Sequence, residues 1–307
     1  MDKLVSIAIP VYKGRFLADA ITSVLRQSYK NIEVIIVNDK SPDNIIDIVE
    51  SFDDDRIHFY ENATNVGSVD PAINWNKCIE YSNGDFFALL CDDDVYKETF
   101  VEEMLAMANK FPLCNVFRAR AEFVDTDGLT TDLYPSSPLW ESMEDYMWHV
   151  LNGFRRQTIS EFLYRTDCLK KLNGFVNLPQ AWVADYVSVF KLSKEGGIAS
   201  SSKILVSFRM SGQNISSQLD SKVLLKLEAN KKAYDITKDA ISITVETWKH
   251  LLSDSVEIWK RRLDRDTICW SHSVDLYRII KHKRKYGYSY ITIIKAVVLR
   301  MLIKWYS

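Results

Sequence analysis

The first part of the chain alternates short apolar runs with segments in which apolar residues recur every three or four positions. Uninterrupted apolar runs predict buried strands, and the longer period predicts helices that bury one face. Strands are predicted at 4–10, 33–37, 56–60 and 85–90, and helices at 16–28, 43–52, 71–82 and 97–110. Strands alternating with helices of about 10–15 residues predict an α/β fold with a mostly parallel sheet flanked by helices.

The pattern changes further along the chain. Three more apolar runs predict strands, at 115–123, 160–169 and 203–208, and DTDG at 125–128 predicts a turn. From residue 220 onward the pattern is almost entirely helical. We therefore expect a domain over 1–218, with halves at 1–96 and 97–218, followed by a helical C-terminal extension over 219–307.

Acidic side chains follow two of the predicted strands. Asp39 follows VIIV, and Asp92, Asp93 and Asp94 follow FFALL. Ligands bind at the carboxyl ends of parallel strands. Carboxylates held close together repel one another unless a cation relieves them, and Mg²⁺ and Mn²⁺ prefer oxygen ligands. Three consecutive aspartates therefore predict a metal site, whereas a single aspartate would be better explained as a helix cap.

The opening segment SIAIPVYKGR narrows the class of ligand. Pro10 closes the first predicted strand, and the ring of Tyr12 just beyond it can pack against a nucleobase, although an ordinary turn explains it equally well. The segment has one glycine, Gly14, and matches neither GxGxxG nor the P-loop pattern. Dinucleotide binding and P-loop phosphoryl transfer therefore lose support.

Composition sets the cellular context. The five cysteines, at 78, 91, 114, 168 and 269, are odd in number and have no CxxC spacing, which favours a reducing cytosol over a disulfide framework. The N-terminus enters a strand at once and lacks the features of a signal peptide. The five histidines show no zinc-ligand spacing. The net charge of the chain is −2, so nucleic acid is not predicted as a partner.

Several segments, taken in order, resemble glycosyltransferase family 2. SIAIPVYKG, SVLRQSYKNIEVIIVNDKSPDN, NVG and NGDFFALLCDDD resemble its nucleotide-binding half, and GFVNLPQAWVADYVSVFKLSKEGGIA and FRMSGQNISS resemble its acceptor-side half. The resemblance covers roughly residues 4–217. It implies a GT-A fold and inverting, metal-assisted transfer of a sugar from a nucleotide-diphosphate donor. Within the family, the chain resembles the enzymes that build bacterial surface polysaccharide.

The resemblance assigns nucleotide-binding roles to the first half. Pro10, Val11 and Tyr12 match the segment that lies against the base, and Asp39 matches the aspartate that hydrogen-bonds uracil or ribose. Asn38 stands where the family often has another aspartate. The donor implied is a UDP-sugar.

CDDD matches the family's DxD region, which binds Mn²⁺ or Mg²⁺. Asp94 is the predicted direct metal ligand, and Asp92 and Asp93 are expected to support the metal, the ribose or the donor sugar. Cys91 stands where relatives often have aspartate, so the register of the first DxD aspartate is open by one position.

The acceptor-side half supplies the predicted base. Asp185 matches the acidic residue that removes the proton of the acceptor hydroxyl. The preceding position is commonly acidic too, and Ala184 there leaves Asp185 as the single carboxylate. This departure keeps open a sugar-nucleotide-binding protein of the same fold with weak or no activity. A sugar-nucleotide pyrophosphorylase is the other alternative, but PVYKGR lacks the glycine-rich loop of that class.

Three further residues are donor or acceptor candidates. Trp182 can stack on a sugar ring, with core packing as an equal alternative. Arg209 and Ser211 lie in FRMSG, which resembles the segment near the donor diphosphate, and a surface ion pair is the competing role for Arg209. For Trp140 and Trp148 packing is favoured.

The end of the chain has a distinct composition. KHKRK at 281–285 precedes YGYSYITIIKAVVLRMLIKWYS, whose apolar run is interrupted by Lys295, Arg300 and Lys304. A spanning helix needs about 20 mostly apolar residues, so none is predicted. The composition is typical of an amphipathic helix with basic and aromatic residues, so we expect residues 281–307 to contact the inner face of the plasma membrane peripherally. That position would suit an enzyme with a glycan or lipid-linked acceptor. A helix buried in a homodimer is the alternative.

Overall fold

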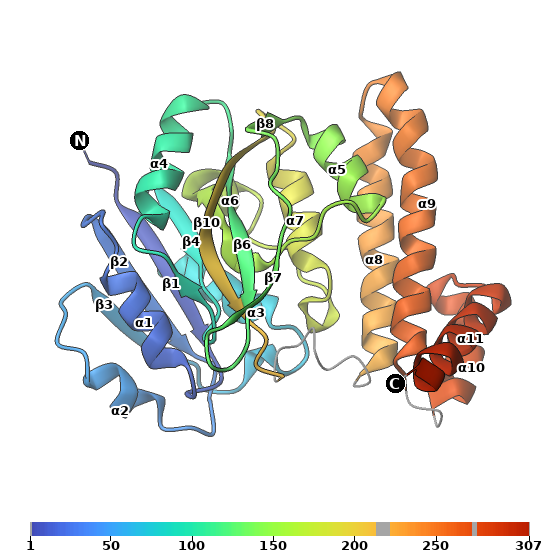
Figure 1. Ribbon diagram of the computed structural model, residues 1–307, viewed down its shortest axis with the longest axis horizontal. Helices are drawn as coiled ribbons and strands as arrows, with labels where there is room; N and C mark the ends of the chain where they lie inside the picture. The colour runs from blue at the N-terminus through green and yellow to red at the C-terminus, as the bar shows by residue number, and fades with distance from the viewer. Residues whose placement is uncertain (1, 213–221, 272–274, 307) are drawn as a thin grey trace.

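The computed structural model of the chain describes residues 2–212, 222–271 and 275–306. One sheet runs through it in the order β3-β2-β1-β4-β9-β6-β10-β5, with β7 beside β6 and β8 beside β10 (Figure 1). The strands are β1 Val5–Val11, β2 Ile32–Asn38, β3 Ile57–Glu61, β4 Phe86–Leu89, β5 Val95–Tyr96, β6 Val116–Val124, β7 Thr130–Leu133, β8 Trp140–Glu141, β9 Phe162–Arg165 and β10 Ile198–Arg209.

Helices cover the sheet and extend beyond it. The α-helices are α1 Leu17–Leu25, α2 Ile45–Glu50, α3 Ala72–Glu80, α4 Phe100–Lys110, α5 Met143–Leu151, α6 Thr166–Lys171, α7 Ala184–Leu192, α8 Val223–Ser242, α9 Glu246–Cys269, α10 Leu276–Tyr286 and α11 Tyr290–Tyr306. Short 3₁₀ helices lie in loops of the described part of the chain: η1 Val66–Ser68, η2 Ile159–Glu161 and η3 Pro179–Ala181.

Strands β3, β2, β1 and β4 form a parallel block. Antiparallel β9 joins this block to β6, which pairs in parallel with the long strand β10. Both faces of β1 are buried: Ile7 and Ile9 belong to the core under α1 and α4, and Ala8 belongs to the core under α3 and α5. A strand that is buried on both faces has an unbroken run of apolar residues, and this run predicted β1 from the sequence.

The eight elements predicted in residues 4–110 are all present, with ends shifted by a few residues. The prediction of an α/β fold is confirmed. The prediction of one strand over 160–169 is partly wrong, because η2, β9 and α6 share that stretch. Helix α6 starts with Asp167 in its first turn and ends with Lys170 and Lys171, charges that suit the helix dipole.

Helix α5 was not predicted, although its start carries a recognisable signal. The backbone N–H of Asp145 donates to Oγ of Ser142, 3.2 Å away. Ser142 and Asp145 thus form the S-x-x-D pattern of an N-cap. The signal was obscured because it follows directly on the loop around 135–138.

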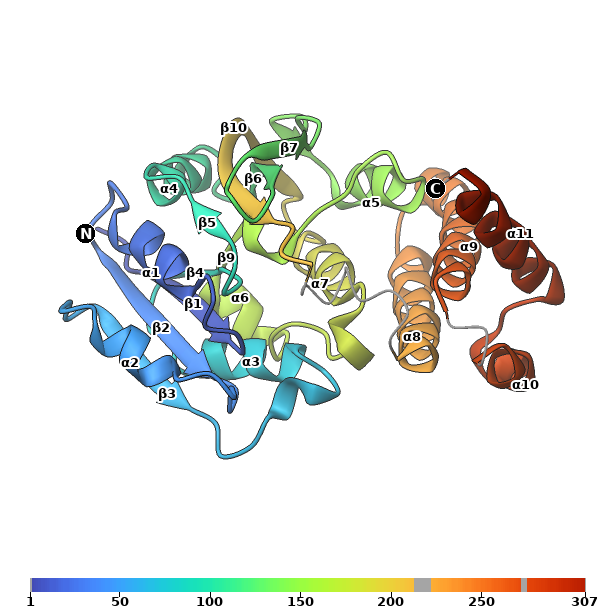
Figure 2. The same ribbon diagram turned by 60° about the horizontal axis from the view of Figure 1, so that its bottom comes forward.

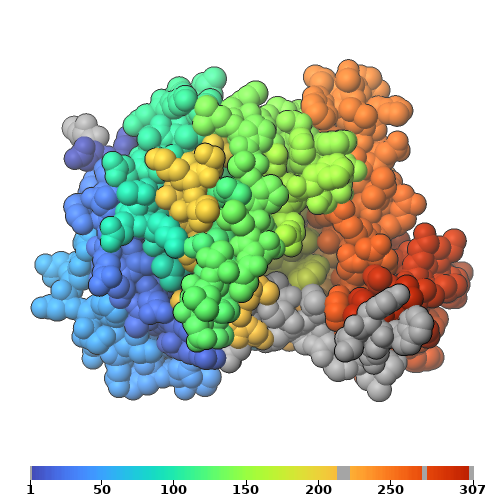
Figure 3. All heavy atoms as spheres, in the orientation of Figure 1, coloured from blue at the N-terminus to red at the C-terminus, as the bar shows by residue number. Residues whose placement is uncertain are grey.

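The predicted C-terminal extension is helical but does not stand apart from the rest. Helices α8 and α9 lie beside α5, α7 and η3 (Figures 1 and 2). Ala233 and Trp259 from these helices share one core cluster with Tyr146 and Phe190. In the space-filling view the orange residues of this pair adjoin the green residues of the sheet domain (Figure 3). The predicted boundary near residue 218 lies outside the described residues.

Helices α10 and α11 form the far end of the molecule (Figure 2). A small apolar cluster packs them against α8 and α9. It contains Ile279, Tyr286 and Ile293 from α10 and α11, and Leu227 and Ile268 from α8 and α9. Among the described residues, no helix is both long enough and apolar enough to span a membrane.

A buried ion pair braces the junction between β6 and η2. Nε of Arg118 donates to Oε1 of Glu161 over 2.7 Å, and the two side chains are 3% and 0% exposed. Arg118 also donates to the carbonyl of Arg156 and to Ser137. Burial raises the pKa of Glu161 to about 7, and the adjacent Arg118 opposes that shift.

We expect Arg118→Met to lower the free energy of unfolding by about 3–5 kcal/mol, because it leaves Glu161 buried without its counter-charge. Urea unfolding followed by circular dichroism measures this change. The matched control is Lys171→Met, which removes the exposed pair with Asp167 and should cost less than about 1 kcal/mol. Equal losses in the two variants would contradict the bracing role of the buried pair.

Candidate functional site

The loops after β1 and β4 meet at the edge of the sheet where these strands end. Oδ2 of Asp92 accepts hydrogen bonds from the backbone N–H groups of Tyr12 and Lys13, both over 2.9 Å. Val11 is buried, Pro10 is half-buried and Tyr12 is 43% exposed. The structure therefore brings the predicted base-binding segment together with the first residue of the aspartate block, which we define as Asp92, Asp93 and Asp94.

Asp94 faces into the protein. Its side chain is fully buried; Oδ2 accepts from the hydroxyl of Ser160 over 2.6 Å, and Oδ1 accepts from the backbone N–H of Arg209 over 3.0 Å. Both of its carboxylate oxygens accept hydrogen bonds from protein groups, and the predicted role of Asp94 as the direct metal ligand stays a prediction. Asp94 ties β4 to η2 and to the end of β10.

Asp93 and the end of β10 contact each other on two sides. Oδ2 of Asp93 accepts from the hydroxyl of Ser211 over 2.8 Å, and its carbonyl accepts from Nε of Arg209 over 3.0 Å. Arg209 also pairs with Asp19 over 3.2 Å and stacks on the ring of Phe16. Arg209 and Ser211 thus lie beside the aspartate block, and the Arg209 side chain is buried. Their contact with the donor diphosphate stays a prediction.

The aspartate block is electrostatically strained. Burial, followed by the neighbouring charge of Asp93, raises the pKa of Asp92 to about 6. Burial also raises the pKa of Asp93, and raises that of Asp94 well above its usual range. A cation beside the block would relieve this cost, because it favours the ionised carboxylates.

The donor atoms of the block suit Mg²⁺ or Mn²⁺, which bind carboxylate oxygens. Among the described residues, however, the block does not itself bring three ligand atoms within 4.8 Å of one another. A cation there would need further oxygens. Mg²⁺ characteristically binds one or two carboxylates together with substrate phosphates, so the block fits a cation that arrives with a diphosphate.

Asp39 organises the loop that contains η1. Oδ1 accepts from the side-chain amide of Asn62 and from the N–H of Val66, and Oδ2 accepts from the N–H of Gly67 over 2.7 Å. A Cβ at Gly67 would lie 2.7 Å from that same oxygen, so only glycine permits this approach. The predicted contact of Asp39 with uracil or ribose stays a prediction. Neighbouring Asn38 donates to Glu61 over 2.8 Å.

The predicted base Asp185 lies in the first turn of α7. Its Oδ2 accepts from Nε2 of Gln157 over 3.1 Å, and Oε1 of Gln157 accepts in turn from the hydroxyl of Tyr146. Burial raises the pKa of Asp185 to about 6, while the hydrogen bond from Gln157 acts in the opposite direction. Asp185 is thus a desolvated carboxylate held in one orientation, with a pKa just below neutral pH.

The segment 157–161 joins the base to the aspartate block. Gln157 contacts Asp185, and Ser160, three residues later, contacts Asp94. Three residues of chain span at most about 11 Å, so this short segment links the start of α7, which carries Asp185, to the aspartate block. Sequence reasoning missed both Gln157 and Ser160, since neither residue type carries a periodicity or motif that marks such a role.

The backbone before Asp185 is strained. Gln180, Ala181 and Val183 have φ values of 63°, 46° and 56°. Positive φ is rare for residues other than glycine, and it is rarest for β-branched residues such as valine. Each such conformation costs on the order of 1–3 kcal/mol. Strain of this kind persists where the surrounding fold fixes the chain. Gln180 is fixed by two hydrogen bonds to the carbonyl of Val69, both over 2.7 Å.

Trp182 lies between this segment and α8. Nζ of the buried Lys226 sits 4.6 Å from the centre of its ring. The buried indole N–H has no hydrogen-bond partner within the described residues. The stacking role of Trp182 stays a prediction. Trp148 packs on Phe154 and the core, as expected for a packing residue. Trp140 is 48% exposed and donates to the carbonyl of Gly196.

A second group of possible metal ligands lies elsewhere in the described part of the chain. Ligand atoms of Glu141, Asp145 and His149 lie within 4.8 Å of one another. Glu141 is paired with Arg155, and Nδ1 of His149 is 2.8 Å from the carbonyl of Asp145. β8, which contains Glu141, pairs with the start of β10, whereas the aspartate block contacts its end. This group is therefore separate from the candidate site.

Comparison with solved structures defines the class of fold. Residues 1–349 of S. aureus TarS in complex with UDP-GlcNAc superpose with a TM-score of 0.61 at 15% identity, covering 98% of this chain and 91% of that one. The mannosyltransferase PcManGT of Pyrobaculum calidifontis, in complex with GDP-Man and Mn²⁺, gives a TM-score of 0.58 at 11% identity, covering 97% and 86%. The sheet and its helices thus have the GT-A architecture, as predicted.

Residues 6–167, more than half of the chain, match the family model described as glycosyl transferase family 2. The chain belongs to glycosyltransferase family 2, which confirms the resemblance found in its motifs.

Individual relatives cover different shares of the chain. The putative teichuronic acid biosynthesis glycosyltransferase TuaG of Bacillus subtilis is 26% identical over 77% of this chain and 88% of that protein. An uncharacterized glycosyltransferase of Rickettsia typhi is 41% identical over 35% of this chain, and the match spans only about a third of that relative, 32%.

We expect Gln157→Leu to raise the pKa of Asp185 above its value of about 6, because the substitution removes the hydrogen bond that favours the carboxylate. Carbon NMR of protein labelled at aspartate carboxyl groups follows the titration. Tyr146→Phe, which keeps Gln157 but removes the hydroxyl that orients its amide, should give a smaller shift in the same direction. An unchanged midpoint in Gln157→Leu would contradict the contact.

Proposed function

We propose that the protein transfers a sugar, with inversion, from a nucleotide-diphosphate donor to a hydroxyl of a glycan or lipid-linked acceptor. The observation that carries the proposal is the connection of the aspartate block to Asp185 through the segment 157–161. The family membership and the nucleotide-sugars bound by TarS and PcManGT support it. A UDP-sugar is the first donor to test.

The donor would lie at the carboxyl ends of β1, β2 and β4. Tyr12 offers an exposed ring for the base beyond Pro10 and Val11, and Asp39 lies at the neighbouring strand end. Ser211, hydrogen-bonded to Asp93, and Arg209 beside it would lie near the diphosphate.

Asp92 and Asp93 would hold Mn²⁺ or Mg²⁺. When bound, such a cation neutralises the departing diphosphate as a Lewis acid. Asp94 keeps the block in place through Ser160 and the backbone of Arg209. This proposal retains Asp92 from the sequence prediction and exchanges Asp94 for Asp93, since Asp94 is the one enclosed by the protein.

Asp185 would act as the base. Gln157 fixes its carboxylate, which accepts the proton of the attacking hydroxyl. With a pKa of about 6 it is ionised at neutral pH yet more basic than an exposed aspartate. One base opposite the leaving group gives single displacement and therefore inversion. Trp182 would border the acceptor or the donor sugar.

Ala184 motivated the alternative of a binding protein with weak or no activity. Its side chain is fully buried in the main core cluster. A carboxylate there would have to be desolvated within apolar packing, so alanine suits this backbone. In the proposed reaction Asp185 would be the single carboxylate at this position. We further propose a cytoplasmic location with peripheral contact at the inner face of the membrane through 281–307; a homodimer is the alternative use of these residues.

The test is calorimetric titration of UDP into the protein with Mn²⁺ and then with EDTA. Binding should require the metal and should weaken more than about tenfold in Asp93→Asn, which removes a proposed ligand charge. The matched control Asp55→Asn, which changes an exposed aspartate in the turn before β3, should bind like the wild type. Equal loss of binding in the two variants would contradict the ligand role of Asp93. No metal-dependent binding of UDP, GDP or dTDP would refute the donor site.

A further inference from the structure

Helix α11 exposes a continuous apolar stripe. Ile291, Ile294, Val298, Met301 and Leu302 follow one another at helical spacing, and each is between 48% and 65% exposed. The opposite face of α11, with Ile293 and Ala296, is buried against α9 and its neighbours. The buried inner face of α11 accounts for its packing against the core, so the exposed apolar stripe needs a separate explanation.

Charge is strongly segregated along the chain. Residues 276–307 contain eight Lys or Arg and no Asp or Glu. The whole chain has 39 Lys and Arg against 41 Asp and Glu, so residues 1–275 have 31 against 41. A net-acidic body thus ends in a purely basic tail that carries the apolar stripe.

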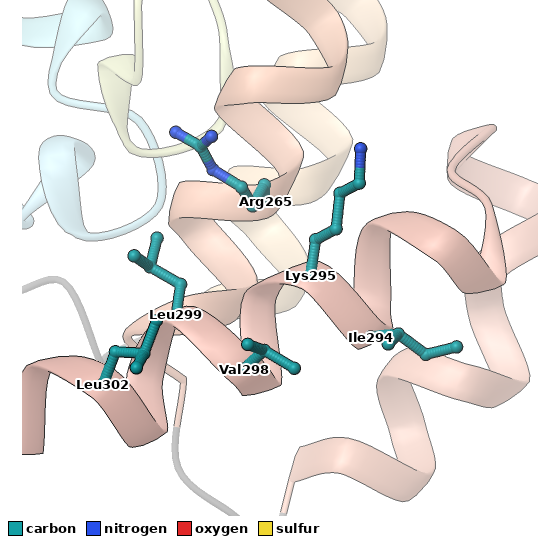
Figure 4. A pocket seen from close by; sticks show the side chains of 6 residues that line it. All are labelled: Arg265, Ile294, Lys295, Val298, Leu299 and Leu302. Atoms are coloured by element: carbon teal, nitrogen blue, oxygen red, sulfur yellow. The ribbon is translucent and has the colours of Figure 1, made fainter.

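Lys283 and Lys295 lie beside the start of α11 and beside the stripe, respectively. Nζ of Lys283 on α10 lies 4.1 Å from the ring centre of Tyr290, where α11 begins. Lys295 borders the stripe and, with Arg265 from α9, lines a pocket of about 320 Å³ whose other walls are Ile294, Val298, Leu299 and Leu302. Figure 4 shows the two cationic side chains above these four apolar ones. Cations beside exposed apolar groups match the boundary between lipid headgroups and acyl chains.

We propose that the stripe of α11, with the cations of α10 and α11, docks the protein on an anionic lipid bilayer. The apolar side chains would enter the headgroup boundary while Lys281, Arg284 and Lys295 contact anionic headgroups. A second copy of the chain fits less well, because facing α11 helices would bring two tails of eight cations and no acidic residue together. The inference extends the proposed membrane contact to a defined surface, and it does not depend on the transferase activity.

Flotation with vesicles tests the proposal. The wild-type protein should float with vesicles of phosphatidylcholine mixed with phosphatidylglycerol, and much less with phosphatidylcholine alone. Ile294→Ser/Met301→Ser should weaken binding by about tenfold or more, because two apolar side chains no longer enter the bilayer. Lys281→Gln/Arg284→Gln should weaken it about fivefold for each cation removed, and more salt should weaken the wild type.

The matched control is Leu113→Ser/Leu129→Ser, which removes two exposed leucines from the sheet domain and should leave flotation unchanged. UDP titration of every variant, run separately, shows whether the fold and donor site persist, so failure of the nucleotide site is distinguishable from failure of docking. The proposal is overturned if the wild type does not float with anionic vesicles, or if it binds both vesicle types equally. It is also overturned if the stripe variant floats like the wild type, or if the stripe instead supports a dimer in ultracentrifugation that the variant loses.

Discussion

The buried carboxylate of Asp94 is the point on which the rest of the site depends. It receives hydrogen bonds from Ser160 and from the backbone of Arg209, and so connects three stretches of chain that are far apart in sequence. A carboxyl group removed from water is costly unless such partners are present, so the three stretches must come together in one arrangement. Asp92 then reaches the loop after β1, and Asp93 reaches Ser211.

The same constraint extends to the candidate base. Ser160 lies in the segment that carries Gln157, and Gln157 holds Asp185. On the other side of Asp185, backbone strain at Gln180 and Val183 is maintained by contacts with the loop around Val69. The apolar core supports both sides, since α8 and α9 complete the cluster beneath α5 and α7. The helical extension is therefore part of what positions the site, and only α10 and α11 project beyond it.

Local pattern sufficed for much of the fold, because the strands of the parallel block are apolar on both faces and the first helices are amphipathic. The acidic block and Asp185 were recognisable from motifs. Which aspartate faces inward was not, because Asp92 and Asp93 lie in a turn after β4, where side-chain direction follows no simple period. Gln157 and Ser160 act through partners 28 and 66 residues away, and no local signal encodes those contacts. The apolar stripe of α11 was visible only as an interrupted run.

The aspartate block and Asp185 are proposed to form one sugar-transfer site. The most direct measurement is release of nucleoside diphosphate from a panel of nucleotide-sugars, in the presence of Mn²⁺ and candidate acceptors, by wild type and by Asp185→Asn, with nucleotide binding measured on the same samples. We predict acceptor-dependent release by the wild type that falls by at least about a hundredfold in Asp185→Asn while nucleotide binding is retained. Equal release by the two proteins would contradict the role of Asp185, and nucleotide binding without acceptor-dependent release from any donor in the wild type would favour a binding protein instead.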